Sequence, residues 1–266
     1  MGAGEYRVRP ARESDKPRIL EISAQVWEGR DYIPRVVDKW LHDSEGEFSV
    51  VLANDELVGY SKLSTLVPGH GWLEGARVDT AWRGRGVATA LARHHIELAR
   101  QAGFSSLRYA TGSDNKASRT MADRLGFELA GEFYRYQAPA EPITDGHLEL
   151  IGEPPPRTNH GLIPVGWTFY PWLDELIARW HNQGHCRYFG QAGAMIHQKR
   201  PGRLTMSLLW GSEDDIPDLL RGIRQQAAPI EDISYVTDCH RYREQLLAAG
   251  FEQLDIDVVV FQYPLA

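Results

Sequence analysis

The spacing of apolar residues in the first half of the chain predicts strands and helices in a definite order. Short runs that alternate or are mostly apolar favour strands at 6–11, 48–53, 57–67, 72–79, 106–111 and 132–137. Apolar residues repeating every three to four positions favour helices at 14–27, 33–43, 87–103 and 115–125. Asn54-Asp55-Glu56 predicts a hairpin turn between the second and third strands. The expected order is β-α-α-β-β-β-α-β-α-β, which is a mixed α/β fold.

The second half has its own alternation of strands and helices. Strands are expected at 192–198, 203–211 and 233–238, and helices around 173–180 and 216–223. Between the halves lies Pro154-Pro155-Pro156, which disfavours both a helix interior and a central strand. We therefore predict a first domain over 1–153, a proline-rich linker over 154–165 and a second domain over 166–266.

Two stretches, one from each half, resemble each other. "LRYATG…DRLGFELAG" and "ISYVTD…LAAGFEQLD" both read as a strand with Tyr-x-Thr, a helix, Gly-Phe-Glu and a further strand. One interpretation is a weak internal repeat in which the second domain copies the first. The alternative is that strand-helix-strand units often look alike, and the sequence leaves both open.

Composition and charge narrow the class of protein. Of the 266 residues, 42% are hydrophobic and 24% are charged, as in ordinary globular proteins. The net charge of -7 disfavours a nucleic-acid partner, which usually requires a basic surface. No apolar run approaches the roughly 18 residues of a membrane span, and the N-terminus lacks the apolar core of a signal peptide. With only Cys186 and Cys239, a disulfide framework is not expected, so we predict a cytoplasmic protein without a membrane partner.

The most unusual stretch is Arg83-Gly84-Arg85-Gly86, at the junction of a predicted strand and a predicted helix. A helix N-terminus presents unpaired N–H groups and a partial positive charge, and glycines let the backbone approach a ligand closely. This pattern favours an anion site, with phosphate the commonest occupant. It is neither a Walker A loop nor a G-x-G-x-x-G turn. The alternative is a glycine-rich turn with solvated arginines.

The surrounding residues identify a family. Arg83-x-x-Gly86-x-Ala88 after Val-Asp resembles the acyl-CoA pyrophosphate loop of the GNAT superfamily of N-acetyltransferases. The segments "VRPARESD", "DELVGYSKLS" and "NKASRTMADRLGFE" match in the same order, so the resemblance covers about residues 5 to 152. It implies a mixed, largely antiparallel GNAT-like sheet flanked by helices, with a second, degenerate GNAT-like domain in tandem.

The resemblance also implies how acetyl-CoA, the acyl donor, would be held. A pyrophosphate would lie on the backbone amides of the glycine turn, beside Arg83, at Gly84, Arg85, Gly86, Val87, Ala88 and Thr89. The strand edge at Ala76, Arg77 and Val78 would pair with the pantetheine amides as an added strand would. Asn115 matches an asparagine that contacts the cofactor arm in the family; the alternative is a helix N-cap.

The expected reaction moves an acetyl group from acetyl-CoA to a primary amine by direct attack. A lysine-like amine is mostly protonated at pH 7, a handicap of about 4 to 5 kcal/mol, so a base is needed. Glu74 lies at the position where family members often carry a base, and strand alternation predicts the same face for Glu74, Ala76 and Val78. The backbone N–H of Val78 would polarise the carbonyl. The alternative for Glu74 is a salt bridge to a nearby arginine.

One departure from the family concerns the departing thiolate. Many relatives carry a tyrosine seven residues after the asparagine as the general acid, and this chain has Ala122 there. Tyr109, Tyr134 and Tyr136 are candidate substitutes, and unassisted departure is a further alternative. The same departure leaves open a non-catalytic acyl-CoA-binding or regulatory module.

The acceptor, a small-molecule or protein amine, is expected over the first two helices and the hairpin. Trp27, Tyr32 and Trp72 are candidates to line its pocket, although aromatic residues there are more often core. No metal is expected, because His181 and His185 have helical spacing but no evident third ligand.

The second half lacks the features of a phosphate site. Where the first half has "VDTAWRGRGVATAL", the second has "LWGSEDDIPDLL", with acidic Glu213, Asp214 and Asp215 in place of the arginines. Acidic residues at a helix N-terminus stabilise the helix and repel phosphate. The second half is therefore expected not to bind CoA, and either to complete the acceptor site or to stabilise the first domain.

Overall fold

The computed structural model describes residues 6–141, 148–200, 202–225 and 231–265. The chain divides into two compact units that are not contiguous in sequence. The first unit comprises Met1–Tyr109, Lys116–Glu128 and Phe261–Ala266, and the second comprises Ala110–Asn115 and Leu129–Val260. Contiguous domains over 1–153 and 166–266, joined by a linker over 154–165, were predicted from the sequence. The divisions differ because a sheet is completed by backbone hydrogen bonds, which a strand from any part of the chain can provide.

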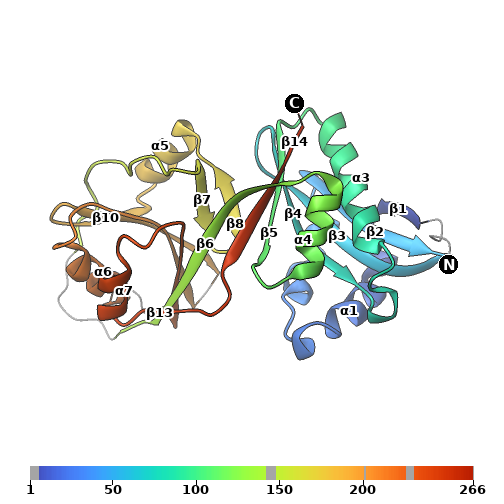
Figure 1. Cartoon of the computed structure of the whole chain (residues 1–266), viewed down its shortest axis with the longest axis horizontal. Coiled ribbons are helices and arrows are strands. Elements are labelled where there is room, and N and C mark those ends of the chain that lie inside the picture. The colour runs from blue at the N-terminus through green and yellow to red at the C-terminus, as the bar shows by residue number, and fades with distance from the viewer. Residues whose placement is uncertain (1–5, 142–147, 201, 226–230, 266) are drawn as a thin grey trace. The chain divides into compact units, whose positions relative to one another are not determined.

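The first unit is a mixed sheet in which antiparallel pairing dominates (Figure 1). Its strands lie in the order β1 (Tyr6–Pro10), β2 (Gly46–Ala53), β3 (Glu56–Val67), β4 (His70–Val78) and β5 (Ser106–Gly112). The pairs from β1 to β4 are antiparallel, and β4 pairs with β5 in parallel. Next to β5 lies β14 (Val258–Pro264), whose residues from Phe261 onward belong to this unit. The predicted mixed, largely antiparallel sheet flanked by helices is confirmed.

The helices of the first unit are α1 (Lys16–Ala24), α2 (Val37–Leu41), α3 (Val87–Gln101) and α4 (Lys116–Leu125). Short 3-10 turns precede or follow them at Glu13–Asp15, Trp27–Gly29, Ile33–Arg35 and Thr80–Trp82. The helix expected over 33–43 is broken into a 3-10 turn and the short α2. Val36 joins the two pieces with φ -122°, outside the helical range, and Pro34 in the preceding turn has no N–H to donate.

Strand β2 shows why the sheet must be covered on both faces. Val50 and Leu52 pack in a core cluster with Ile19 and Ile22 of α1, together with Trp40 of α2. The alternate residues of β2, Val51 and Ala53, pack instead in a cluster with Val87 and Leu91 of α3. Successive side chains of a strand point to opposite faces, so the continuous apolar run of β2 requires helices on both sides.

A polar group is buried between α3 and the sheet. His95 is completely buried, with its Nε2 atom 2.8 Å from the Ser49 hydroxyl and its Nδ1 atom 3.4 Å from the Ser61 hydroxyl. Burial, with a smaller effect from the neighbouring His94, lowers the pKa of His95 from 6.5 to about 3. The folded protein therefore holds this imidazole in its neutral form at pH values where an unfolded chain would protonate it.

This histidine makes the stability of the first unit depend on pH. Between pH 6.5 and 3 the unfolded chain binds a proton at His95 that the folded chain does not, so the free energy of unfolding falls as the pH is lowered. The expected slope from this group is about 1.4 kcal/mol per pH unit. Urea denaturation between pH 7.5 and 5 measures it. In His95→Gln the contribution of this histidine to the slope should disappear. An unchanged slope would contradict the assignment of the pH dependence to His95.

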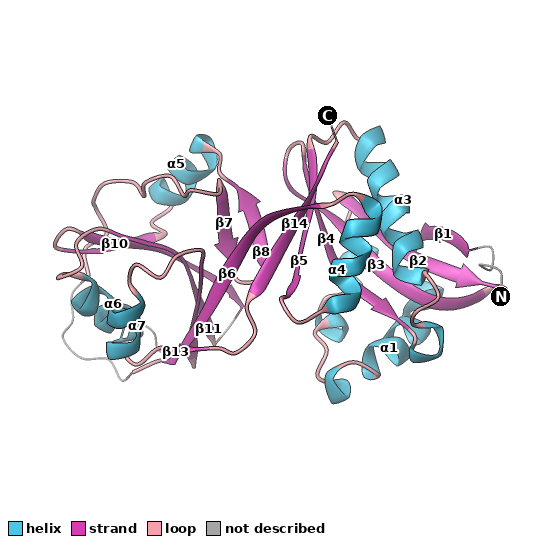
Figure 2. Ribbon diagram, viewed as in Figure 1, coloured by secondary structure: helices cyan, strands magenta, loops and turns pink. Residues whose placement is uncertain are grey.

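The second unit contains a sheet ordered β6 (Glu128–Pro139), β12 (Asp232–Thr237), β11 (Arg203–Trp210), β10 (Ala192–Arg200) and β9 (Cys186–Phe189). Strand β13 (Glu252–Gln253) pairs with β6, and β7 (Leu162–Val165) pairs with β8 (Thr168–Pro171) in a separate hairpin (Figure 2). The helices are α5 (Asp174–Asn182), α6 (Ile216–Gln225) and α7 (Arg243–Ala248). Strand β7 begins inside the predicted linker 154–165.

The two stretches that resemble each other end their helices in the same way. Gly126 and Gly250 are left-handed, with φ of +81° and +78°. The next residue is phenylalanine in both cases, and its N–H donates to a carbonyl five residues earlier: Phe127 to Ala122 at 3.0 Å and Phe251 to Leu246 at 2.9 Å. The two stretches therefore share the way in which their helices end, with a left-handed glycine followed by a phenylalanine. The degenerate GNAT-like character of the second half stays a prediction.

Within the described residues, no helix is both long and apolar enough to cross a membrane.

Candidate active site

The glycine turn has the backbone conformation that its sequence suggests. Gly84 and Gly86 are left-handed, with φ of +74° and +88°, and both are exposed. A Cβ atom added to either would meet nothing within 4 Å. Glycine is therefore favoured here by backbone conformation and not by close packing, and the space above the turn is open to a ligand.

The start of α3 directs unpaired N–H groups towards that space. The first bond entering the helix runs from the N–H of Ala90 to the carbonyl of Gly86, at 3.0 Å. The N–H groups of Val87, Ala88 and Thr89 precede it and are the donors that every helix leaves unpaired. Arg83 and Arg85 are exposed on the turn, the latter with its guanidinium 5.2 Å from the Trp82 ring centre. Cationic side chains beside a helix N-terminus are the combination that favours anion binding in proteins.

Strand β4 separates from β5 before this turn, and side chains of Arg77 and Arg83 donate to the carbonyls of Ala76 and Val78 there. Its parallel pairing with β5 ends at Trp72 and Arg108, although β4 continues to Val78. The N–H of Asp79 donates to the carbonyl of Val58 on β3, at 2.9 Å. Neighbouring N–H groups of an extended chain point to opposite edges, so the N–H of Val78 points away from β3. The edge at Ala76, Arg77 and Val78 can therefore accept an extended ligand.

A bulge in β4 corrects one expectation. Glu74 lies opposite Lys62 of β3, and Arg77 lies opposite Tyr60, so Gly75 and Ala76 together face one residue of β3. Gly75 has φ +65° and an added Cβ would lie 2.5 Å from the Trp40 ring, so this position requires glycine. Because of the extra residue, Glu74 does not share a face with Val78, as simple alternation predicted.

The bulge places Glu74 on the face of the sheet that α1 covers. Glu74 is half-buried, and the Ser64 hydroxyl donates to its Oε1 atom at 2.6 Å. Burial, followed by the negative charge of Glu74, raises the pKa of Tyr32 well above its usual value. Ser64 was missed in the sequence analysis. Antiparallel pairing of the predicted strands 57–67 and 72–79 would have placed the two side chains near each other, because β3 and β4 pair through these positions.

A buried ion pair lies beside this carboxylate. Arg77 donates from Nε and Nη2 to both oxygens of Asp31, at 2.9 and 2.8 Å, and Ser23 donates to Asp31 at 3.0 Å. The Arg77 guanidinium also lies 4.8 Å from the Trp27 ring centre and 5.5 Å from that of Tyr32. Burial alone would raise the pKa of Asp31, but the hydrogen bonds from Arg77 lower it. No sequence pattern pointed to Asp31, which lies in an irregular loop.

The three predicted acceptor residues differ in exposure. Trp27 is 61% exposed, and both it and Glu28 are left-handed, with φ of +47° and +57°. Such a conformation is unfavourable for residues other than glycine and is found disproportionately at functional sites. Tyr32 is half-buried beside Glu74, whereas Trp72 is only 2% exposed and lies within the unit. Trp27 and Tyr32 are therefore exposed enough to contact a ligand, whereas Trp72 is a buried residue of β4.

The remaining candidates lie as follows. The side chain of Asn115 donates to the Thr111 hydroxyl at 3.0 Å, and both residues belong to the second unit. Ala122 is completely buried, and the Tyr109 hydroxyl donates to the carbonyl of Ser118 at 3.0 Å. Tyr134 and Tyr136 belong to the second unit. His181 lies 3.0 Å from the Tyr188 hydroxyl, and His185 lies 2.9 Å from the carbonyl of Ile196.

Acidic, histidine and cysteine side chains do not gather in groups of three that could hold a metal ion anywhere in the part of the chain that the structure describes.

Two curated proteins are similar in sequence to part of this chain. The chain is 36% identical over 98 residues to a histidine N-acetyltransferase of Xenopus tropicalis, and 30% identical over 89 residues to one of Oreochromis niloticus. These matches cover 36% and 33% of this chain, but only 30% and 26% of the two relatives. The chain thus spans less than a third of the curated relatives that it matches.

Solved structures of other proteins superpose on nearly the whole length of this chain. A GCN5-related N-acetyltransferase of Sphaerobacter thermophilus superposes with a TM-score of 0.64 over 98% of this chain and 96% of its own, at 13% identity. One from Kribbella flavida gives a TM-score of 0.53 over 98% and 72%, at 15% identity. The family model described as "Acetyltransferase (GNAT) family" matches residues 14–127, which include both the glycine turn and strand β4. Residues 14–127 of this chain therefore match the acetyltransferase (GNAT) family model, and the fold is that of GCN5-related N-acetyltransferases.

Proposed function

We propose that the chain is an N-acetyltransferase that moves an acetyl group from acetyl-CoA to a primary amine by direct attack. The observation that carries this proposal is the open edge of β4 running directly into a turn of unpaired amides, with Gly84 and Gly86 both left-handed under open space. An extended chain ending in a phosphate group is the ligand that such an edge and turn complement.

In this proposal the cofactor lies along the first unit in two parts. Its pyrophosphate accepts hydrogen bonds from the amides of residues 84–89, and Arg83 and Arg85 contribute positive charge. Its pantetheine arm pairs with the edge at Ala76, Arg77 and Val78, where the N–H of Val78 points away from β3, while the side chain of Arg77 stays bonded to Asp31.

The reaction then needs only groups of this chain and the two substrates. Glu74 takes a proton from the ammonium group of the acceptor, and the neutral nitrogen attacks the thioester carbonyl carbon. The N–H of Val78 stabilises the negative charge that develops on the carbonyl oxygen. The carbon–sulfur bond breaks, CoA leaves as a thiolate, and the amide nitrogen gives its second proton to that thiolate, so that CoA is released as a thiol and Glu74 returns its proton to solvent.

The thiolate leaves without a tyrosine acid in this proposal. Ala122 has no proton to give, and Tyr109 already donates its proton to the carbonyl of Ser118. Burial raises the pKa of Tyr109 to about 12, which makes it a weak acid. A thiol with a pKa near 8.5 is a good enough leaving group to depart unassisted near neutral pH.

The acceptor is a small-molecule or protein amine that approaches across Trp27 and Tyr32, the ligand-accessible aromatic residues beside Glu74. Two relatives named histidine N-acetyltransferase favour a small amine among these choices. We place the activity in the cytoplasm, which suits the two free cysteines.

A panel of amines tests the proposal. The full chain is incubated with acetyl-CoA and each amine in turn, and free CoA thiol is measured. We expect release that depends on the amine, with histidine and other amino acids among the acceptors. Stabilisation by acetyl-CoA without thiol release from any amine would instead support a non-catalytic acyl-CoA-binding module, the second candidate, which the buried Ala122 favours.

Replacing Glu74 by glutamine tests the base. We expect turnover to fall by about 100-fold or more near pH 7 and by less at high pH, where the amine is already neutral. The affinity for CoA should stay nearly unchanged, because the carboxylate is not in the glycine turn. The matched control is Glu97→Gln, on the exposed side of α3. A pH–rate profile identical to that of the unmodified protein would remove Glu74 from this role.

A further inference from the structure

The second unit contains a cavity of about 240 Å3 that no part of the proposed reaction uses. It lies at the carboxyl ends of β11 and β12, under the segment from Pro155 to Pro164. Its lining combines apolar and aromatic residues, among them Phe133, Leu208, Trp210, Tyr235 and Tyr242, with polar and charged ones.

The cavity is a consequence of how two strands diverge. The parallel pairing of β11 with β12 runs from Arg203 and Asp232 to Met206 and Tyr235 and then ends. Both strands continue, to Trp210 and Thr237 respectively. Sheets with parallel strands bind ligands preferentially outside the carboxyl ends of those strands, where neighbours separate. The position of this cavity is therefore one where the fold itself creates room for a ligand.

A buried hydroxyl at the cavity lacks a partner. Ser207 lines the cavity and is only 1% exposed, and its Oγ atom has no hydrogen-bond partner among the described residues. Buried hydroxyl groups are nearly always hydrogen-bonded, to protein, water or ligand. Thr237, which also lines the cavity, instead bonds with its neighbour Cys239.

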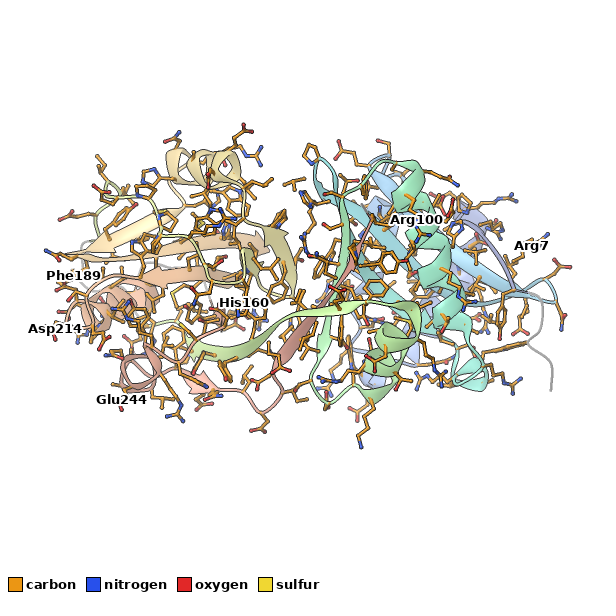
Figure 3. The ribbon with its side chains drawn as sticks, turned by 45° about the horizontal axis from the view of Figure 1, so that its top comes forward. Arg7, Arg100, His160, Phe189, Asp214 and Glu244 are labelled. Carbon is orange, nitrogen blue, oxygen red and sulfur yellow. The ribbon has the colours of Figure 1, made fainter. Side chains whose placement is uncertain are left out.

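The charged residues of the cavity are of both signs. Arg157 and Arg241 are exposed, and Arg241 is 3.2 Å from Glu213 in an ion pair that is itself exposed. Exposed pairs of this kind contribute little, so both guanidinium groups are available to an anion. Asp238 is more buried, at 17% side-chain exposure, and lies 3.6 Å from Nε2 of His160, which Figure 3 labels. The cavity thus offers a carboxylate for a cation and guanidinium groups for an anion.

We propose that this cavity binds a small zwitterion with the charge pattern of an α-amino acid and an apolar or aromatic side chain. The ligand's ammonium group pairs with Asp238, and its carboxylate pairs with Arg157 and Arg241. Its side chain lies against the aromatic walls, and a polar atom of the ligand or a water held with it pairs with Ser207. This site is separate from the proposed acetyl transfer and does not depend on it.

Cys239 provides a local measure of occupancy. It lines the cavity and is exposed, whereas the other cysteine, Cys186, is buried. The full chain, without CoA, is treated with iodoacetamide, and alkylation of each cysteine is followed by mass spectrometry. L-Phenylalanine is the probe. We expect it to slow alkylation of Cys239 saturably, at concentrations up to roughly 10 mM, the weak end of small-ligand affinity.

Two analogues and two variants test the charge pattern. 3-Phenylpropionate lacks the ammonium group and 2-phenylethylamine lacks the carboxylate. Each should require a concentration at least about tenfold higher than phenylalanine to give the same protection of Cys239. Asp238→Asn and Arg157→Gln should weaken protection by phenylalanine to a similar degree. Glu74→Gln, in the other unit, should leave the protection curve unchanged.

Three outcomes would overturn the proposal. The first is the absence of protection by phenylalanine. The second is equal protection by 3-phenylpropionate, which would make the site one for simple anions. The third is protection that disappears in Glu74→Gln and persists in Asp238→Asn, which would place the amino acid at the first unit's site.

Discussion

Replacing Gly86 by valine lowers the affinity for CoA by at least about a hundredfold, because two separate effects act on the same turn. Valine disfavours the φ of +88° that Gly86 adopts, and its branched side chain occupies the open space where the pyrophosphate is proposed to lie. Hydrogen bonds to charged groups contribute about 1.5 to 3 kcal/mol each, so losing two of them is sufficient for this change. Calorimetric titration with CoA measures it.

The matched control is Gly103→Val, at the other end of α3. Gly103 is also left-handed, with φ +69°, and an added Cβ there likewise meets nothing within 4 Å. The strain is thus similar, but no ligand is expected there. Gly211 in the second unit would not serve, since an added Cβ would lie 2.0 Å from the carbonyl of Gln191. Equal loss of affinity in Gly86→Val and Gly103→Val would indicate general destabilisation, and would contradict the proposed phosphate site.

Replacing Asp31 by asparagine destabilises the first unit by about 3 to 5 kcal/mol, the usual result of removing one partner of a buried pair. The side chain of Asp31 is 1% exposed and that of Arg77 is 13% exposed, so the change leaves a guanidinium charge buried without its counterion. The asparagine oxygen can accept only part of what both carboxylate oxygens now accept from Arg77 and Ser23. Urea denaturation of the full chain, followed by a signal from the first unit, measures the loss.

Asp55→Asn is the matched control. Asp55 pairs with Arg7 at 2.7 Å, close to the 2.8 Å of the Asp31–Arg77 pair, but the two side chains are 87% and 65% exposed. Exposed pairs contribute about 0 to 1 kcal/mol, so this variant should be nearly as stable as the unmodified protein. A similar fall in the free energy of unfolding in both variants would show that burial does not determine how much the Asp31–Arg77 pair contributes to stability. Because Arg77 also contacts Trp27, Asp31→Asn should in addition alter acceptor binding.

The pattern of apolar residues was sufficient to predict most elements of the first unit, but not the break in the helix expected over 33–43 or the contribution of β14. Strands β2 and β3 and helix α3 lie close to where periodicity placed them, because each depends on local alternation and on a nearby turn. The hairpin β7–β8 and strand β9 were not predicted. Each has only four residues, too few for alternation to stand out, and β7 carries Pro164.

The candidate site also has one part that the sequence predicts and one part that it does not. The turn at Gly84 and Gly86 could be predicted, since its residue types are required by backbone conformation, which is a local property. The side chains around Glu74 could not. The bulge at Gly75 reverses the alternation that had placed Glu74 with Val78, and it is stabilised by the fit of Gly75 against Trp40, a residue far away in sequence.

By itself the sequence indicated a family resemblance over about residues 5 to 152, the glycine turn at Gly84 and Gly86, and the order of the strands around it, because these depend on neighbours in the chain. Only the tertiary structure decided that Asp31 lies against Arg77, that Ser64 donates to Glu74, and that the residues from Phe261 onward complete the first unit. It also decided that β11 and β12 diverge around a cavity with an unpaired Ser207. Each of these contacts forms between segments that are far apart in the sequence, which bury their surfaces and satisfy their hydrogen bonds together. Local patterns in the sequence do not determine such contacts.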